Sequence, residues 1–323
     1  MVGALSIRYV HDNWVIPMTQ LHDTTLVDVS PILSVYRNTN FIEKYVLSII
    51  RRYSFDYLFF YSDAINGDFT DGFFDIVRGS GIPVFTFLAD DVPEIWYNQN
   101  RPYDHRFDLV ATHSKAGFER RKQEGVADNV IYLPWGYSDK LFKKHPGMPY
   151  QYDVVYIGSN LCQENDPEVY YGGGDARQQL LREVYAFCME HDIRFKVFGA
   201  GWNRHPVLKE CDGGMLSNEQ MVAVYNQSRI VLNPGYSADE GAEQCYQTKL
   251  RHFEVLGCGA FQLVNRNPEL TRYPLRRRQQ RYELLEVCWY LQAMSNNHRP
   301  MPEVKCSPIH RMRQRCRTYR DPA

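Results

Sequence analysis

The stretch QTKLRHFEVLGCGAFQLV, residues 247–264, carries charged side chains toward a turn that contains two glycines. Lys249 and Arg251 are cations, and Glu254 follows as a carboxylate before the sequence becomes apolar. Two cations can hold an anionic group, and a carboxylate can accept hydrogen bonds from two hydroxyls. The pattern is also typical of a solvated helix face that ends at a glycine cap.

Composition limits the classes of protein to which the chain can belong. Its 323 residues suggest about two domains, and 44% of them are hydrophobic, enough for two cores. A formal net charge of −1 gives no overall attraction to nucleic acid or to an anionic membrane. No apolar run approaches the roughly 20 residues of a membrane span, and no secretory signal is recognised. Eight cysteines without CxxC spacing predict free thiols in a cytoplasmic protein.

Short β-rich runs alternate with longer helical patterns. FDYLFFYS, IPVFTFLADD and FDLVATHS predict buried strands, and the segments between them predict helices. The alternation restarts at YDVVYIGS, after a polar stretch with two prolines, residues 139–151, which we interpret as a linker. Ser217 followed by Gln220 predicts a capping box at the start of a later helix. This alternation is typical of parallel sheets covered by helices on both faces.

We therefore expect an α/β fold of two Rossmann-like domains that face each other across a central cleft. Residues 1–145 are assigned to the first domain, residues 150–295 to the second, and residues 296–323 to a basic C-terminal segment. Ligands of open α/β sheets bind beyond the carboxyl ends of the strands. The residues that follow each predicted strand are therefore candidate site residues.

Several segments occur in an order that is similar to a known family. They are LADDVPE, YDVVYIGS, KVFGAGW, YNQSRIVLNPG and RHFEVLGCGAFQLV. As an ordered set they resemble the CgeB-like (spore-maturation) glycosyltransferases, a branch of the group 1 family with the GT-B fold, over residues 25–300. The resemblance implies that the second domain binds a nucleotide sugar and that the first holds the acceptor.

The resemblance also gives roles to the charged residues of the opening stretch. Glu254 matches the glutamate whose carboxylate accepts hydrogen bonds from the ribose hydroxyls of the donor. Lys249 and Arg251 then become candidates for the diphosphate, whose charge must be neutralised as it leaves. The family implies a UDP-sugar as the first candidate donor, no bound metal, and retention of the anomeric configuration.

The chain departs from the family pattern at two places. The group 1 motif has a second glutamate eight residues upstream of the first, where this chain has Tyr246, and Glu240 and Glu243 are out of register. This departure leaves the donor sugar open. In addition, residues 1–24 resemble a helix, so we expect the first strand of the fold to be missing or replaced.

Glycines follow two predicted strands of the second domain. Gly158 and Ser159 could place backbone N–H groups against a phosphate, although any strand-to-helix turn of this fold looks similar. Gly199 and Gly201 allow close backbone approach, and Trp202 either borders the nucleobase or packs in the core. Two weaker phosphate candidates are residues 172–174, a run of three glycines, and Arg177 in the first turn of the next helix.

The first domain offers candidate catalytic residues. Asp90 and Asp91 follow a predicted buried strand, where a carboxylate could act as general base on an acceptor hydroxyl or cap the following turn. His113 follows the next strand and either contacts the transferred group or is an ordinary loop histidine.

The acceptor and the activity leave alternatives open. The acceptor is a saccharide or a protein hydroxyl, or it is DNA if the arginines at 276–278 and 281 and the basic run 310–320 grip a phosphate backbone. A catalytically inactive GT-B module that only binds a nucleotide is the third interpretation, because Tyr246 replaces the expected glutamate.

Overall fold

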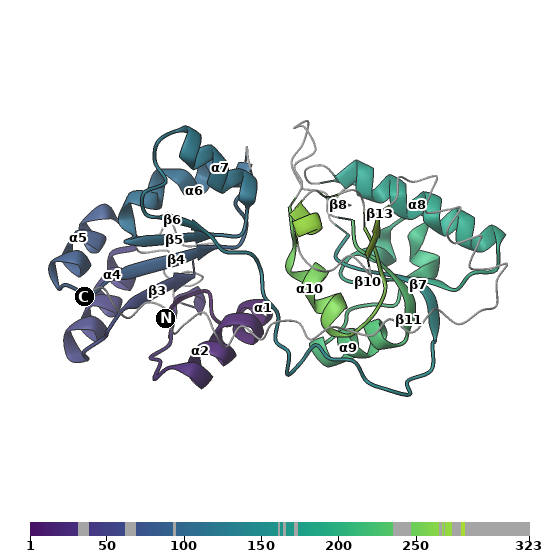
Figure 1. Cartoon of the computed structure of the whole chain (residues 1–323), viewed down its shortest axis with the longest axis horizontal. Coiled ribbons are helices and arrows are strands. Elements are labelled where there is room, and N and C mark those ends of the chain that lie inside the picture. The colour runs from purple at the N-terminus through teal and green to yellow at the C-terminus, as the bar shows by residue number, and fades with distance from the viewer. Residues whose placement is uncertain are drawn as a thin grey trace.

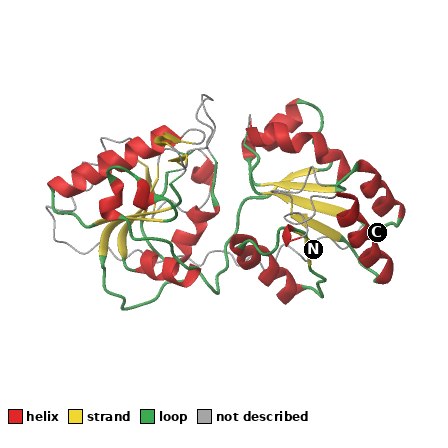
Figure 2. Cartoon of the chain, turned by 180° about the vertical axis from the view of Figure 1, so that it is seen from behind, coloured by secondary structure: helices red, strands yellow, loops and turns green. Residues whose placement is uncertain are grey.

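The computed structural model describes residues 1–31, 39–61, 69–92, 95–160, 162–163, 166–170, 174–234, 247–264, 267, 269–272 and 279–281. These residues form two lobes, each built on a parallel sheet, that face each other (Figure 1). We call residues 1–136 lobe one and residues 152–281 lobe two. Both sheets have helices on their two faces (Figure 2), so the predicted α/β fold class is confirmed.

Lobe one has the strand order β2-β1-β3-β4-β5-β6, with all the described pairs parallel. Its strands are β1 (Val2–Gly3), β2 (Val27–Asp28), β3 (Leu58–Tyr61), β4 (Val84–Leu88), β5 (Leu109–Thr112) and β6 (Val130–Tyr132). Its helices are α1 (Arg8–Val10), the π-helix η1 (His11–Val15), α2 (Ile16–Leu21), α4 (Thr39–Arg52), α5 (Asp71–Gly79), α6 (Ile95–Asn100), the 3-10 helix η2 (Arg101–Arg106) and α7 (Lys115–Gln123).

The first strand, which we expected to be missing or replaced, is present as the two-residue β1. Val2 pairs with Val27 of β2 and with Phe60 of β3, so β1 lies inside the sheet. Gly3 fits this place because a Cβ there would lie 3.0 Å from the Cβ of Tyr61. The strand is therefore truncated rather than missing, and a strand this short has no alternating pattern to read. Residues 8–21, in contrast, are helical as predicted.

Lobe two has the strand order β10-β7-β11-β12-β13, again with parallel pairs. Its strands are β7 (Tyr152–Ile157), β10 (Phe195–Phe198), β11 (Ser228–Leu232), β12 (Gln262–Val264) and β13 (Gln279–Arg281), with the separate hairpin β8 (Cys162–Gln163) and β9 (Asp166–Tyr170). Its helices are α8 (Gly174–Glu190), α9 (Asn218–Asn226), α10 (Leu250–Gly257) and the 3-10 helices η3 (Trp202–Arg204), η4 (Leu208–Cys211) and η5 (Glu269–Arg272). The predicted capping box of Ser217 and Gln220 is confirmed at the start of α9.

Buried side chains on both faces of each sheet form the cores. Val154 and Val155 of β7 point to opposite sides and belong to two different hydrophobic clusters of lobe two. Lobe one likewise has one cluster under α4 and α5 and another under the helices of residues 8–21. Within the described residues, no helix is long and apolar enough to cross a membrane.

The segment that we interpreted as a linker is irregular but packs firmly on lobe two. Phe142 is 2% exposed and belongs to the same cluster as Val155 and Val255. The backbone N–H of His145 donates to Asn226 Oδ1 (2.7 Å), and Asn226 Nδ2 donates to the carbonyl of Lys143 (3.0 Å). The chain therefore leaves lobe one after Trp135 and is already anchored to lobe two a few residues later.

A substitution at Gly257, the last residue of α10, tests whether the linker packs on lobe two in this way. A Cβ at this position would overlap the ring of Tyr137 and lie 2.8 Å from the carbonyl oxygen of Phe142. Overpacking of this kind costs about 1–3 kcal/mol, so Gly257→Ala should lower the midpoint of urea unfolding. Gly79→Ala is the matched control, because nothing lies within 4 Å of a Cβ there and the change should stabilise by about 0.4–1 kcal/mol. Equal midpoints for the two variants would show that the linker does not pack as described.

Candidate functional site

The candidate site lies at the carboxyl ends of the central strands of lobe two. Strand β7 has β10 on one side and β11 on the other, so the order of the strands reverses there. Ligands of open α/β sheets bind at such a switch point. Gly158 follows β7 and Asn233 follows β11, and α10 lies on the side of lobe two that faces lobe one (Figure 1).

Two glycine turns interlock at this edge. The N–H of Gly158 donates to Phe198 O, and the N–H of Asn160 donates to Ala200 O, each at 2.8 Å. Gly199 has φ of +136°, and a Cβ there would overlap the carbonyl of Gly158. Gly199 is therefore required for turn-against-turn packing, whereas a Cβ on Gly158 would overlap the hydroxyl of Tyr156. This packing leaves Ser159 exposed at the tip. A contact between these turns and phosphate stays a prediction.

Trp202 has a different role from the one proposed beside the nucleobase. Its side chain is fully buried, and its Nε1–H donates to the carbonyl of Gly158 at 2.7 Å. A fully buried ring has no surface on which a base could stack, so that assignment is wrong. Trp202 is a core residue that fixes the Gly158 turn.

A network of buried polar side chains fixes the start of α10. Nδ1 of His252 accepts from the backbone N–H of Lys249 (2.8 Å), as a capping-box side chain does. Burial lowers the pKa of His252 to about 3, and its second nitrogen faces the backbone of Asn233, so the ring is neutral. Gln262 donates to the carbonyl of His252 (2.9 Å) and accepts from the side chain of Asn233 (3.1 Å). Sequence reasoning assigned no role to His252 or Gln262, because neither belongs to a recognised motif.

Three cations gather beside this network. Burial lowers the pKa of Lys249, and the charges of Arg177 and Arg251 add to this shift, whereas the charge of Asp90 opposes it. The resulting pKa is about 8. The Nε atoms of Arg177 and Arg251 are buried and find no acceptor among the described residues. Arg251 also lies under the first glycine turn, 3.1 Å from the place of a Cβ on Gly158. The three cations are half-buried, and like charges gathered in a partly shielded site favour the binding of an anion.

Glu254 is buried on the same helix, less than one turn before its end. The residue is 5% exposed, and burial raises the pKa of its carboxyl to about 7, although the charge of Arg251 opposes the shift. A carboxyl with this pKa is only partly ionised at neutral pH. It becomes a full carboxylate when hydrogen-bond donors approach it.

Lobe one places two of its predicted residues against this cluster. Asp90 is exposed after β4, and its charge acts on Lys249. His113 is 1% exposed, packs beside Trp135 with 5.2 Å between ring centroids, and faces the backbone of Ala89 and Thr248. Burial lowers its pKa to about 4, so the imidazole is neutral. The structure thus brings Asp90 and His113 together with Lys249, although their catalytic roles stay predictions.

Asp91 points away from the site, and its predicted role as a general base is wrong. Its side chain is fully buried and accepts from Arg121 Nη1 (2.6 Å) and from Thr112 Oγ1 (2.6 Å). Arg121 also binds Asp104 at 2.6 Å, which makes a closed ionic network inside lobe one. Adjacent residues after a strand point to opposite sides, so Asp90 faces lobe two and Asp91 faces the interior.

Other predicted residues lie outside the described part of the chain. They are residues 172–173, Glu240, Glu243, Tyr246, Arg276, Arg277, Arg278 and residues 296–323. The described His, Cys, Asp and Glu residues include no group of three or more that could hold a metal ion.

The chain is similar to known proteins both in sequence and in fold. Residues 177–280, which include the cations and Glu254, match the family model described as glycosyl transferase-like. HepE of Anabaena, solved with UDP-glucose, is similar over 91% of this chain and 81% of its own, at 14% identity and a TM-score of 0.55. An alpha-glucosyltransferase solved with UDP and mismatched DNA is similar over 85% of this chain and 77% of its own, at 14% identity and a TM-score of 0.55.

The fold is GT-B. These similarities extend over both lobes, and the family match falls on the lobe that carries the cation cluster. TarM of S. aureus is also similar, over 79% of this chain and 52% of its own, at 10% identity and a TM-score of 0.51. The chain spans about half of a further structure, 49% of an accessory secretory protein chain from Streptococcus pneumoniae, with a TM-score of 0.46. Comparison with curated proteins gives no match.

The buried ionic network of lobe one gives a prediction with a neighbouring control. Arg121→Ala leaves the carboxylates of Asp91 and Asp104 buried without their cation, which should cost about 3–5 kcal/mol of the free energy of unfolding. Arg120→Ala removes a partly exposed pair with Glu124 (3.1 Å) and should cost about 0–1 kcal/mol. Urea denaturation of the two variants measures the difference. A loss for Arg121→Ala no larger than that of Arg120→Ala would contradict the account.

Proposed function

We propose that the protein is a glycosyltransferase that moves a sugar from a nucleotide-sugar donor, bound to lobe two, to an acceptor hydroxyl presented by lobe one. The observation that carries the proposal is the gathering of Lys249, Arg251 and Arg177 at the strand ends of lobe two. A donor diphosphate supplies the two negative charges that this cluster requires. The resemblance of residues 247–264 to the group 1 glycosyltransferases and the glycosyl transferase-like match support the same interpretation.

The reaction follows from this placement. The bond between the anomeric carbon and the diphosphate oxygen breaks, and the acceptor oxygen forms a new bond to that carbon. Negative charge grows on the leaving diphosphate, where fixed cations stabilise it more than they stabilise the bound donor. The acceptor proton passes to a phosphate oxygen of the leaving group, so a strong protein base is not required. Transfer on this path retains the anomeric configuration.

Glu254 holds the nucleoside in this proposal. A carboxylate has two oxygens and can accept one hydrogen bond from each of two vicinal ribose hydroxyls. The structures that contain UDP-glucose or UDP support a UDP-sugar as the first donor to test. Asp90 and His113, on the opposite wall, are the proposed contacts to the transferred sugar or the acceptor. The buried free thiols of Cys188, Cys211 and Cys258 support a cytoplasmic location.

The two alternative functions, a DNA-modifying enzyme and an inactive nucleotide-binding module, lead to different expected measurements. A DNA-modifying enzyme needs phosphate contacts from arginines 276–278 and 281, and its binding to duplex would fall by a log–log salt slope of roughly −0.9 per contact. An inactive module would bind a nucleotide but release no product from a nucleotide sugar. Turnover of UDP-sugars and a gel-shift titration at two salt concentrations separate these cases from a saccharide- or protein-directed enzyme.

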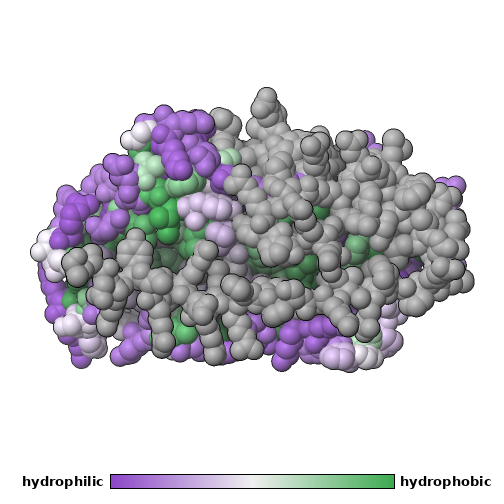
Figure 3. Space-filling model, in the orientation of Figure 1, coloured by the Kyte–Doolittle hydropathy of each residue, from purple (hydrophilic) through white to green (hydrophobic). Residues whose placement is uncertain are grey.

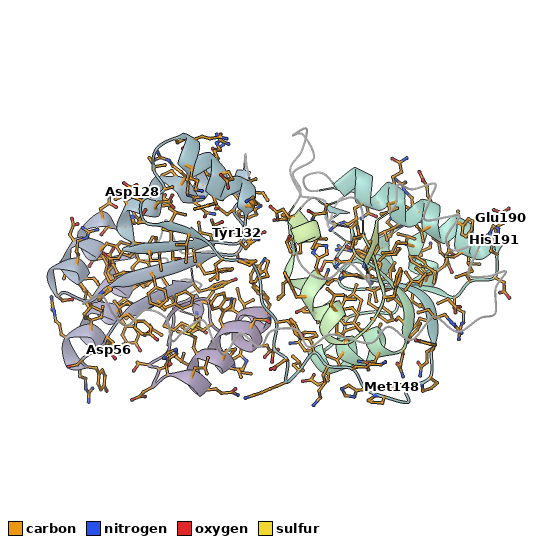
Figure 4. All side chains as sticks on the ribbon, in the orientation of Figure 1. Asp56, Asp128, Tyr132, Met148, Glu190 and His191 are labelled. Atoms are coloured by element: carbon orange, nitrogen blue, oxygen red, sulfur yellow. The ribbon has the colours of Figure 1, made fainter. Side chains whose placement is uncertain are left out.

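Glu254→Ala tests the donor assignment. Loss of two charged hydrogen bonds should weaken the affinity for the nucleotide by about 1–3 kcal/mol in isothermal titration calorimetry. Glu190→Ala is the control, because Glu190 ends α8 on the far side of lobe two (Figure 4) and is exposed. A folded Glu254→Ala protein with the affinity of the wild type would reject the assignment.

The affinity for a nucleotide sugar should fall at both low and high pH, which gives the plot of affinity against pH an acid limb and an alkaline limb. Glu254 must be ionised to accept both hydroxyls, so the affinity falls as the pH drops below its pKa of about 7. Lys249 must be charged to bind the diphosphate, so the affinity falls again as the pH rises above its pKa of about 8. A nucleotide sugar is the right probe because its diphosphate diester stays ionised throughout this range.

Two variants assign the limbs. Glu254→Gln should remove the acid limb, and Lys249→Arg, whose guanidinium stays charged, should remove the alkaline limb. Titration calorimetry across this pH range measures both. If the affinity of Glu254→Gln still falls at low pH, or that of Lys249→Arg still falls at high pH, other groups titrate at the site.

A further inference from the structure

Helix α10 has faces with different surroundings. Leu250, Phe253 and Gly257 share one face, because residues three or four apart lie above each other on a helix. Arg251 and Glu254 each directly follow a member of this face, so they lie about 100° round the helix from it. The remaining residues of the helix are buried in lobe two. Two neighbouring faces of α10 are therefore available for different contacts.

The first of these faces contacts lobe one. Leu250 and Phe253, both half-buried, pack against a hydrophobic cluster whose buried members all belong to lobe one, among them Phe59, Phe87 and Trp135. Hydrophobic side chains are visible on the side of lobe two that faces lobe one (Figure 3), where α10 lies opposite α1 (Figure 1). We call the packing of Leu250 and Phe253 on this cluster the lobe contact.

The same cluster supports the candidate acceptor wall. The ring of His113 lies beside those of Trp135 and Phe87, with 5.2 and 6.4 Å between ring centroids. Ala89, a buried member of the cluster, directly precedes Asp90. The lobe contact therefore joins α10 to the part of lobe one from which His113 and Asp90 extend.

Hydrogen bonds fix the start of α10 to the rest of lobe two. Oε2 of Glu269 accepts from the backbone N–H and from the hydroxyl of Thr248, each at 3.0 Å. Gln262 of β12 donates to the carbonyl of His252 on the helix at 2.9 Å. These partners are buried, so their bonds are shielded from water. The helix therefore moves with lobe two, and the lobe contact carries its position to lobe one.

We propose that Leu250 and Phe253 are positioning residues that set the distance between the donor and the acceptor wall. The proposal rests on the proposed function and deepens it, because it concerns the arrangement in which transfer takes place. One helix of about two turns directs Arg251 and Glu254 to the donor and the lobe contact to lobe one. Neither Leu250 nor Phe253 is assigned a contact with the donor.

Other contacts with the N-terminal helices of lobe one lie away from α10. Asn218 of α9 donates to Asp12, and Lys140 of the linker donates to Gln20 (2.6 Å). These polar contacts keep the lobes associated when Phe253 is shortened. Shortening Phe253 should therefore shift lobe one against α10 rather than separate the lobes.

Three variants of α10 test the proposal. Phe253→Ala removes most of the lobe contact, whereas Phe253→Leu keeps an apolar side chain in it. Val255→Ala is the matched control, because Val255 is fully buried on the same helix and packs inside lobe two. A loss of activity that came only from a less stable helix would appear in Val255→Ala as well.

We expect Phe253→Ala to lower kcat by about 10–100-fold, because a small displacement of the reacting groups has that effect. The Kd for the nucleotide sugar, measured by calorimetry without acceptor, should stay near the wild-type value, because the donor binds lobe two alone. Phe253→Leu should recover most of the turnover. Val255→Ala should keep the wild-type kcat below its unfolding temperature.

Hydrogen–deuterium exchange measures the lobe contact independently of turnover. Residues 8–15 of lobe one include Val10 and Val15, which belong to the cluster that α10 covers. Their backbone N–H groups should exchange faster in Phe253→Ala than in the wild type, because a helix that loses packing opens more often. In Val255→Ala their exchange should match that of the wild type.

The outcomes distinguish this inference from the proposed function. If the wild type neither binds nor turns over any nucleotide sugar, the proposed function fails, and the exchange of residues 8–15 without a ligand decides whether the lobe contact holds lobe one. Equal kcat in Phe253→Ala and Val255→Ala, or unchanged exchange in residues 8–15, would reject the positioning role. A Kd that weakens as much as kcat falls would make Phe253 a donor-site residue instead and overturn the proposal. Should Phe253→Ala fail to fold, Leu250→Ala decides by the same measurements.

Discussion

The repulsion among the half-buried cations at the start of α10 is the interaction on which the rest of the site depends. Lys249 has a pKa lowered to about 8 because it is buried and because Arg177 and Arg251 are near. A fold tolerates such a cluster when an anion completes it, since like charges in a dry site destabilise each other strongly. The cluster stands where the strand order of lobe two reverses, the place where this architecture binds ligands. Its chemistry and its location therefore indicate the same kind of ligand, a phosphate ester.

The surrounding structure keeps these cations in place largely through neutral groups. His252 fixes the backbone of Lys249 while staying uncharged, because burial lowers its pKa to about 3. Gln262 in turn holds the carbonyl of His252, and the Gly158 turn packs over Arg251. Neutral hydrogen-bonding groups therefore orient the helix, whereas the carboxylates of Asp90 and Glu254 offset part of the charge of Lys249 and Arg251. On the opposite wall, His113 is also neutral, so it adds no further repulsion to the cluster.

Much of the fold and part of the site could be predicted from the sequence because they depend on local patterns. The alternation of strands and helices and the capping box of Ser217 are signals within a few residues. Asp90 and Asp91 show the limit of such signals, because two identical adjacent residues face opposite environments and only Arg121 decides which one is buried. Trp202 could not be assigned because core packing and base stacking use the same residue type. Glu269 was missed because Thr248, whose backbone N–H and hydroxyl it accepts, lies 21 residues earlier in the sequence.

The most direct test of the account compares nucleoside diphosphates with their nucleosides. Titration calorimetry should be carried out on the wild-type protein with UDP, GDP and ADP and with uridine, guanosine and adenosine. If the cation cluster is the diphosphate site, the diphosphate of the preferred base should bind at least about 100-fold more tightly than its nucleoside, because charged hydrogen bonds contribute about 1.5–3 kcal/mol each. Equal affinities for the diphosphate and the nucleoside of every base would contradict the assignment of Lys249, Arg251 and Arg177 to the donor diphosphate.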